Sequence, residues 1–345
     1  MVPGMDPVYA FAYDGRIAEE LRTAGCEVHI LGPAWARDPF SIWRARRKLS
    51  ALRRARECDA AVAHSAWSLA LLGPAAGRPL LFWQHDAFDR PDWLARWSAW
   101  TPLDLVIANS RFTAGTTKRV HRTAPATVIH PPVAPELSAL SVDRRAFLRA
   151  RWGADASSVV ILQAGRFERW KGHLLHLESL ARLKHRGEWT LWIAGAPQRS
   201  EEFSYFDEIE RAAVALGIQD RIRFLGHRTD LSAIMRASDI YCQPNTGAES
   251  FGLTFVEAMQ AGLPVVTTDM GGPKEIIDSH HGVLVPAADA LRLAQALERL
   301  LSDKTLRRDL GSRGAARATS LCDPRTQMTA LAAVVESLRE PALAA

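Results

Sequence analysis

Two segments in the second half of the sequence carry residues suited to binding a phosphorylated ligand. The first reads Q-A-G-R-F-E-R-W-K-G-H over residues 163–173. Gly165 allows a sharp turn after a predicted strand, and Arg166 and Lys171 place two cations where a diphosphate needs its charge neutralised. An Arg after a strand and a Lys before a helix are also ordinary surface residues, so this segment alone supports both interpretations.

The second segment, Q-P-N-T-G-A-E-S-F-G-L-T-F-V-E-A-M over residues 243–259, predicts a loop followed by the start of a helix. The first N–H groups of a helix have no partner within it and attract anions, so this start is a natural cradle for phosphate. Glu249 precedes the predicted helix and Glu257 lies about one turn inside it, which lets two carboxylates reach different parts of one ligand. A capping Glu and a solvated helical Glu are the alternative, which the complete string disfavours. The other residues expected at this cradle are Asn245, Phe251, Gly252, Leu253 and Thr254.

Parallel strands must position both segments. Short β-branched or apolar runs alternate with helical patterns through the whole sequence, which is typical of sheets wrapped by helices. Such sheets bind ligands beyond the carboxyl ends of their strands. The predicted strands are residues 8–12, 27–31, 60–64, 80–84, 105–108, 127–130, 159–164, 190–194, 222–225, 240–243, 264–267 and 283–285. The pattern predicts an α/β protein with two doubly wound domains.

The domain boundary is expected where the sequence disfavours a helix. The chain of 345 residues is long enough for two domains. The run P-P-V-A-P within residues 131–141 is stiff, so we place the boundary in this segment. The predicted domains are residues 1–140 and 141–325, and residues 326–345 form a helical segment expected to cross back to the first domain.

The net charge of +5 lies entirely in the first half of the chain. Residues 1–145 hold 19 Lys and Arg against 14 Asp and Glu, and the remaining 24 and 24 cancel. Residues 41–56 contribute much of this excess as a basic amphipathic helix. Such a helix either presents a solvated outer face or lies on anionic lipid, and we favour the solvated face. Nucleic acid is not an expected partner, because the basic residues lack the interleaved aromatics of a single-strand platform.

The sequence predicts a cytoplasmic protein, with peripheral contact at the inner face of the membrane as the alternative. No apolar run approaches the ~20 residues that span a bilayer, and residues 1–7 lack the features of a signal peptide. The four cysteines show no zinc-type spacing and are expected to be reduced.

The motifs of the second half resemble those of the family 4 retaining glycosyltransferases, which have the GT-B fold. The matching strings are G-R-x4-K-G at 165–172, F-L-G-H at 224–227, E-S-F-G-L-T-F-V-E-A-M at 249–259, G-L-P-V-V-T-T-D-M-G-G-P-x-E at 262–275 and G-V-L-V-P at 282–286. Weaker matches in the first half are W-Q-H-D at 83–86, I-A-N-S-R-F-T at 107–113 and V-I-H-P-P-V at 128–133. The resemblance implies two Rossmann-like domains facing a cleft, and transfer of a sugar from a UDP- or GDP-sugar to a hydroxyl acceptor.

The resemblance also implies a role for each matching position of the second half. Arg166 and Lys171 neutralise the donor diphosphate and stabilise the departing nucleotide. Glu257 holds the ribose hydroxyls, and Glu249 faces the transferred sugar.

Three further residues gain roles in the same way. His227 and Arg228 belong to the segment that flanks the base of the donor. His85, at the end of a first-domain strand, resembles the family's histidine that reaches the sugar and the reactive centre. A structural histidine is the alternative at that position.

The expected chemistry needs no metal and no cofactor besides the donor substrate. Breaking the bond from the anomeric carbon to a diphosphate builds negative charge on phosphate, so fixed cations and helix N–H groups are the main catalytic term. The sequence has no D-x-D signature of a metal-bridged diphosphate. The resemblance implies front-face attack, with the departing phosphate accepting the acceptor's proton, and a covalent route through Glu249 stays open.

The resemblance to the family begins late in the first domain. Residues 9–22, Y-A-F-A-Y-D-G-R-I-A-E-E-L-R, resemble the family's second strand and the helix after it. We therefore expect the first domain to lack the usual opening strand and its Gly-rich turn, which Asp14 and Gly15 partly replace. This expectation keeps two other functions open: a trimmed, weakly active or inactive nucleotide-sugar-binding protein and, less favoured, an NDP-sugar epimerase.

Overall fold

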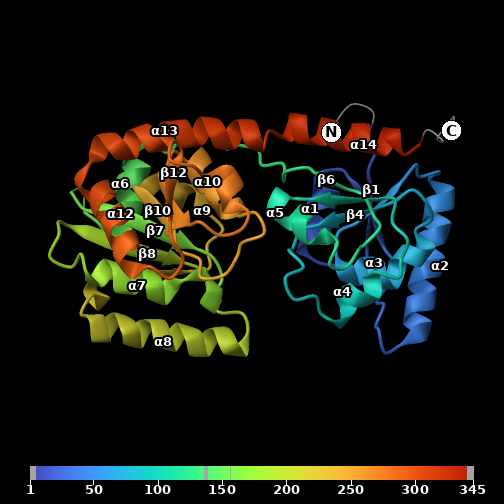
Figure 1. The fold of residues 1–345 in the computed structure, drawn as a ribbon, viewed down its shortest axis with the longest axis horizontal. Coiled ribbons are helices and arrows are strands. Elements are labelled where there is room, and N and C mark those ends of the chain that lie inside the picture. Colours follow the sequence, from blue (N-terminus) through green and yellow to red (C-terminus); the bar gives the residue numbers. More distant parts are fainter. Residues whose placement is uncertain (1–4, 136–138, 156, 340–345) are drawn as a thin grey trace. The chain divides into compact units, whose positions relative to one another are not determined.

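The chain divides into two compact units (Figure 1). A computed structural model describes residues 5–135, 139–155 and 157–339. The beginning of the chain, the middle of the predicted linker and the end of the predicted terminal segment therefore lie outside the described residues. One unit comprises the chain up to Pro132 together with the segment from Pro324 onward, and the other comprises Val133–Asp323.

The first unit is built from parallel strands connected by helices. Its strands are β1 (Val8–Phe11), β2 (Glu27–Ile30), β3 (Ala61–Ala63), β4 (Leu80–Gln84), β5 (Leu105–Ala108) and β6 (Ala126–Val128). Its helices are α1 (Arg16–Thr23), α2 (Pro39–Ala55), α3 (Ala66–Leu72), α4 (Trp93–Ser98), α5 (Arg111–Thr117) and α14 (Pro324–Ser337), with a short 3-10 helix at Gly73–Ala75. Strands β3, β4, β5 and β6 form one sheet in that order, β1 and β2 form another, and no ladder of the described residues joins β1 to β3.

The second unit is a doubly wound α/β sheet. Its strands are β7 (Val159–Ala164), β8 (Trp189–Ala194), β9 (Ile222–Gly226), β10 (Ile240–Gln243), β11 (Val265–Thr268) and β12 (Gly282–Val285). Its helices are α6 (Val142–Arg151), α7 (His173–Ala181), α8 (Ser200–Leu216), α9 (Leu231–Ala237), α10 (Leu253–Gln260), α11 (Pro273–Ile276), α12 (Ala290–Ser302) and α13 (Lys304–Leu321), with 3-10 helices at Arg169–Lys171 and Gln219–Arg221. The six strands are parallel and lie in the order β12-β11-β10-β7-β8-β9.

Two hydrophobic clusters cover the two faces of this sheet. Because side chains alternate along a strand, Ile161 of β7 joins a cluster with α7, α8 and α12. Its neighbours Val160 and Leu162 join a second cluster with α6, α9, α10 and α13. Both faces are therefore buried, as expected for a parallel sheet.

The twelve predicted strands are confirmed, with bounds that differ by at most two residues. The unit boundaries differ from those predicted at 140 and 325. The chain joins the second unit from Val133, because Val133 N donates to Cys322 O at 2.9 Å and Gln260 Nε2 donates to Val133 O at 3.0 Å. The terminal helix α14 packs Leu331 against the first-unit cluster that contains Leu81 and Ile107.

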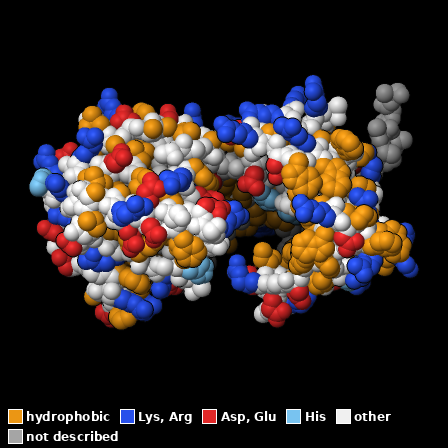
Figure 2. Space-filling view, turned by 90° about the horizontal axis from the view of Figure 1, so that it is seen from below, with side chains coloured by type: hydrophobic (Ala, Val, Ile, Leu, Met, Phe, Trp, Pro, Cys, Tyr) orange, Lys and Arg blue, Asp and Glu red, His pale blue; other side chains and the backbone are white. Residues whose placement is uncertain are grey.

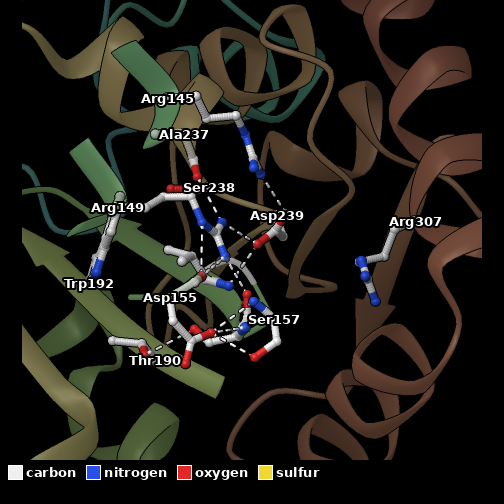
Figure 3. A network of polar contacts seen from close by, with 12 residues as sticks. Arg145, Arg149, Asp155, Ser157, Thr190, Trp192, Ala237, Ser238, Asp239 and Arg307 are labelled. Atoms are coloured by element: carbon white, nitrogen blue, oxygen red, sulfur yellow. Dashed lines mark hydrogen bonds and ion pairs between the residues drawn. The ribbon is translucent and has the colours of Figure 1, made fainter. Parts of the chain in front are cut away.

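A polar network joins the amino ends of β7 and β10 (Figure 3). Arg149 on α6 is 5% exposed and donates to Asp239 Oδ2 at 2.8 Å and to the carbonyls of Asp155 and Ser158. Asp239 also accepts the N–H of Val160 at 2.8 Å. The network lies at the edge of the sheet opposite the carboxyl ends of the strands, so its role is structural.

Replacing Arg149 by Ala is expected to lower the free energy of unfolding by about 3–5 kcal/mol, because it removes the buried cation that pairs with Asp239 and leaves the carbonyls of Asp155 and Ser158 without this donor. Urea denaturation followed by tryptophan fluorescence measures the change. Arg145 is the matched control, because it donates to the other oxygen of Asp239 at 2.8 Å but is 39% exposed. We expect Arg145→Ala to lower the free energy of unfolding by about 1 kcal/mol or less. Equal losses in the two variants would contradict the assignment.

Candidate functional site

The strand order of the second unit brings the two phosphate-binding segments together. β7 pairs with β10 in the centre of the sheet, with Ile161 opposite Ile240. The chain moves from β7 to β8 and β9 on one side and then returns to β10, β11 and β12 on the other. This reversal is a topological switch point, and α/β sheets bind ligands beyond the strand ends there. The segments of residues 163–173 and 243–259 leave these two central strands.

Backbone contacts lock the loops after β7 and β10 against each other. Gly172 has φ +74°, and a Cβ at this position would lie 1.8 Å from the carbonyl oxygen of Pro244. Thr246 N donates to Trp170 O at 2.8 Å. The left-handed glycine of this turn is therefore Gly172, whereas Gly165, which the sequence predicted as the turning residue, has no positive φ.

Lys171 and Glu249 form an ion pair at the centre of this site. Lys171 Nζ donates to Glu249 Oε2 at 2.6 Å, and the two side chains are 14% and 15% exposed. Asn245 Nδ2 reaches the same oxygen at 3.4 Å, and Lys171 Nζ lies 3.9 Å from the centroid of the Trp170 ring. Low solvent access strengthens the interaction between these charges. The structure thus joins a cation and a carboxylate that are 78 residues apart in the sequence.

Arg166 is the second cation after β7 and is more accessible. Its Nη2 donates to Glu168 Oε1 at 2.5 Å, and its Nη1 lies 3.7 Å from Oε1 of the buried Glu202. The Arg166 side chain is 42% exposed. These carboxylates fix the guanidinium on one side and leave its remaining donors open to a ligand.

The start of α10 supplies backbone donors beside the ion pair. Helix α10 begins at Leu253, and its N-cap Gly252 has φ +104° and no side-chain cap. The N–H groups of Leu253 and Thr254 therefore lie in the uncapped first turn, which favours an anion. A Cβ on Gly252 would meet the Phe255 ring at 2.3 Å, so this position needs glycine. The Phe251 side chain is buried, and the Leu253 side chain is 47% exposed.

Glu257 and Glu249 differ in their surroundings. Glu257 lies one turn into α10 and keeps access to solvent, yet its neighbours desolvate the carboxyl group and raise its pKa. The backbone of Glu249 is held by Gly271 and Gly272. Gly272 N donates to Glu249 O at 2.8 Å, and a Cβ on Gly271 would lie 2.3 Å from that oxygen. The two carboxylates are thus placed by separate elements, as the sequence predicted.

His227 and Arg228 follow β9, which β8 separates from β7. Arg228 makes a bidentate ion pair with Asp230, with both hydrogen bonds at 2.8 Å, and packs on the Trp152 ring. His227 is exposed. No hydrogen bond or ion pair among the described residues joins either side chain to Lys171 or Glu249.

In the first unit, His85 follows β4 and is paired with a second histidine. His64 Nδ1 lies 3.1 Å from His85 Nε2, and the two rings stack with centroids 5.4 Å apart. Asn109 Nδ2 donates to the His85 carbonyl at 2.6 Å, and Trp83 stacks on both rings. Neighbouring groups desolvate both rings, although both residues are exposed at the surface. This desolvation lowers the pKa of His85, and desolvation together with His85 lowers that of His64 to about 4. Both rings are therefore neutral at pH 7.

His64 was not predicted from the sequence as a site residue. His64 is the last residue of the predicted strand 60–64, and His85 directly follows the predicted strand 80–84. The carboxyl ends of parallel neighbours meet at one edge of a sheet. The strand order, in which β3 lies beside β4, was the signal that the sequence alone did not provide.

A buried histidine beside the site makes stability depend on pH. His173 stacks on Phe167, and no described group hydrogen-bonds to either of its ring nitrogens. Burial, with a smaller effect of Lys171, lowers its pKa to about 3, whereas an unfolded histidine titrates near ~6.5. The unfolded chain therefore binds a proton that the folded chain does not, and stability falls as the pH drops below about 6.5.

The free energy of unfolding of the wild type is expected to fall between about pH 7 and pH 5. In His173→Phe this fall should be smaller by about 2 kcal/mol, because the variant has no buried imidazole to protonate on unfolding. Urea denaturation at the two pH values gives this difference. The exposed His185 is the control, and His185→Phe should leave the pH dependence as in the wild type. An unchanged pH dependence in His173→Phe would show that this ring is protonated in the folded state.

Comparisons with known proteins agree with this architecture. The model of the family described as glycosyl transferases group 1 matches residues 144–317, and the model of glycosyltransferase family 4 matches residues 8–137. A phosphatidyl-myo-inositol mannosyltransferase of Mycobacterium leprae is 45% identical over 112 residues, which cover 32% of this chain and 30% of the relative. A D-inositol 3-phosphate glycosyltransferase of Streptomyces bingchenggensis is 32% identical over 219 residues, which cover 61% of this chain and 48% of the relative. The matches thus span half or less of the length of these curated relatives.

Solved structures match nearly the whole chain. A glycosyltransferase of Rickettsia africae superimposes with a TM-score of 0.87 at 20% identity, covering 98% of this chain and 92% of its own, which supports the fold alone. HepE of Anabaena, solved in complex with UDP and glucose, gives a TM-score of 0.83 at 25% identity and covers 95% of this chain and 91% of its own. The glycosyl transferases group 1 model covers half of the chain and includes every residue of the switch-point site. The fold is therefore GT-B, and the chain belongs to the glycosyl transferases group 1 family.

Proposed function

We propose that this chain is a hexosyltransferase-type enzyme that moves a sugar from a UDP- or GDP-sugar to a hydroxyl acceptor in glycan or glycolipid synthesis, with retention of the anomeric configuration. The observation that carries the proposal is the Lys171–Glu249 ion pair beside the uncapped start of α10 at the switch point. A diphosphate at this helix start would meet backbone donors and the Lys171 cation at once, while Glu249 stays available for sugar hydroxyls.

The remaining residues take supporting roles in this proposal. Arg166 neutralises the donor diphosphate together with Lys171, and Glu257 accepts hydrogen bonds from the ribose. Gly165, Asn245, Phe251, Gly252, Leu253 and Thr254 line the donor site, with His227 and Arg228 near the base. His85 acts on the transferred sugar, and His64 determines which nitrogen of His85 carries the proton.

The proposed transfer breaks the bond between the anomeric carbon and the diphosphate oxygen. The acceptor hydroxyl attacks from the leaving-group side, and the departing diphosphate takes up its proton, so no separate base is needed. Charge accumulates on the diphosphate, where fixed cations and N–H groups stabilise it most. We propose that the reaction needs no metal and takes place in the cytoplasm. Among the described residues, no group of three His, Cys, Asp or Glu side chains is arranged to hold a metal.

A donor panel tests the proposal. UDP-, GDP- and ADP-sugars are incubated with the full chain in EDTA, and nucleotide release and the anomeric form of the product are both recorded. Release with a retained product, lost in Arg166→Ala and Glu257→Ala, supports the donor site and identifies the nucleotide. Binding without turnover would instead favour a nucleotide-sugar-binding protein, and an isomerised donor would favour an epimerase. A sugar adduct trapped on the wild type but not on Glu249→Gln would replace front-face attack by the covalent route.

A further inference from the structure

Large aromatic side chains are exposed on the first unit around the start of α2. Trp35, Phe40 and Trp43 are 57%, 75% and 56% exposed, and the Tyr13 ring lies 5.5 Å from the Trp35 ring. The exposed tryptophans among the described residues all belong to the first unit. Figure 2 shows large hydrophobic side chains (orange) among Lys and Arg side chains (blue) on the surface of the first unit, at the right of the view. Aromatic side chains gathered in this way mark an interaction surface.

Cations lie on the same outer face of α2. The helix has six basic residues and no acidic one. Arg44 and Arg47 are exposed and lie four and seven residues after Phe40, which places them on the Phe40 face of the helix. Lys48 and Arg54 are exposed too, and no carboxylate of the described residues pairs with Arg44, Lys48 or Arg54. These charges are therefore available to an anionic partner.

The inner face of the same helix packs against the rest of the first unit. Ala45 is buried with Leu71 and Leu72, and Ile42 packs against them. Arg46 Nε donates to the Leu71 carbonyl at 2.6 Å, so this basic residue serves the fold. Helix α2 therefore packs on the first unit through its inner face. The exposed aromatic and basic residues on its outer face take no part in this packing.

We propose that Tyr13, Trp35, Phe40 and Trp43, together with the exposed basic residues of α2, form an aromatic-basic surface that binds an anionic lipid bilayer. Arginine and lysine meet lipid phosphates, and indole rings are at their most stable at the level of the headgroups. None of the described helices has the length and composition of a membrane span. The proposed contact is peripheral and is made by the side chains of the aromatic-basic surface. The sequence favoured a solvated face for this helix, and the exposed aromatic residues reverse that preference.

Co-sedimentation of the full chain with lipid vesicles tests the surface. Vesicles of phosphatidylcholine alone are compared with vesicles that contain about 30% phosphatidylglycerol, at roughly 50 mM and 500 mM salt. The wild type should bind only the anionic vesicles, and more weakly at high salt. The combined change Trp35→Ala, Phe40→Ala and Trp43→Ala should lower the partition coefficient at least about tenfold. The combined change Arg44→Gln, Arg47→Gln, Lys48→Gln and Arg54→Gln should lower it about a hundredfold at low salt.

A matched variant on the second unit controls for loss of charge and aromatic area. Phe203→Ala combined with Arg308→Gln and Arg313→Gln changes exposed residues of α8 and α13 and should bind vesicles as the wild type does. Thermal unfolding of each variant shows that the fold is retained. Because no donor or acceptor is present, vesicle binding is read independently of the proposed transfer, and either proposal can fail while the other stands.

Three outcomes overturn the proposal. The first is equal binding to neutral and anionic vesicles, and the second is a triple aromatic variant that binds as the wild type does. The third is full displacement from anionic vesicles by a single-stranded oligonucleotide, which would assign the surface to nucleic acid instead.

Discussion

Replacing Lys171 by Ala is expected to lower donor turnover by about 10²–10³-fold, equivalent to about 3–4 kcal/mol of transition-state stabilisation. The ammonium group is largely buried and is held in place at 2.6 Å by Glu249, whose side chain adjoins Gly252, the N-cap of α10. A fixed cation of this kind acts on the charge that develops on the leaving diphosphate. We therefore expect kcat to fall more than KM rises, measured by nucleotide release from the donor found in the panel.

A double-mutant cycle separates this role from a merely structural ion pair. Lys171→Ala leaves the Glu249 carboxylate poorly solvated and unpaired, so part of its effect is lost stability. Adding Glu249→Gln should restore the thermal midpoint, because the uncompensated charge is removed, but it should not restore turnover. Lys184→Ala, at an exposed position, is the control for loss of a lysine. Recovery of turnover in the double variant would mean that Lys171 only neutralises Glu249.

The sequence predicted the members of this site but not their contacts. Gly172 illustrates the limit: its positive φ and its approach to Pro244 join the loops after β7 and β10, yet these loops are more than seventy residues apart in the chain. Local patterns define strands because alternation and length are local properties. The order β10-β7-β8 depends on how the whole sheet assembles, and this order creates the switch point.

The surface of the first unit was harder to predict for a different reason. Phe40 and Trp43 are apolar and lie near the inward-facing Ile42 and Ala45, so a hydrophobicity pattern alone does not tell which of them face solvent. The same limit applies to His64 and His85, whose pairing requires β3 and β4 to be neighbours. In each case the residue types were visible in the sequence, and the missing information was the tertiary arrangement that positions them.

Replacing His85 by Ala is expected to lower sugar transfer about 10²-fold or more while nucleotide affinity stays within about twofold of the wild type. The reason is that the cations, the carboxylates and the helix start of the donor site all belong to the second unit, whereas His85 belongs to the first. Transfer is followed by product formation, and affinity is measured by calorimetry with the nucleoside diphosphate. His29→Ala, which changes another partly exposed histidine of the first unit, should leave both quantities unchanged.

The effect of His64 on the same reaction follows from the proton that the two rings share. A hydrogen bond of 3.1 Å between His64 Nδ1 and His85 Nε2 requires one of these nitrogens to carry a proton and the other to accept it. We expect His64→Phe to keep the ring stacking but to shift the tautomer of His85, seen in the ¹⁵N chemical shifts of its imidazole, and to lower transfer about tenfold. The amide of His64→Asn can hydrogen-bond where Phe cannot, so this variant should recover part of the rate. If both variants change the rate equally and leave the His85 nitrogens as in the wild type, His64 packs against His85 without directing its proton.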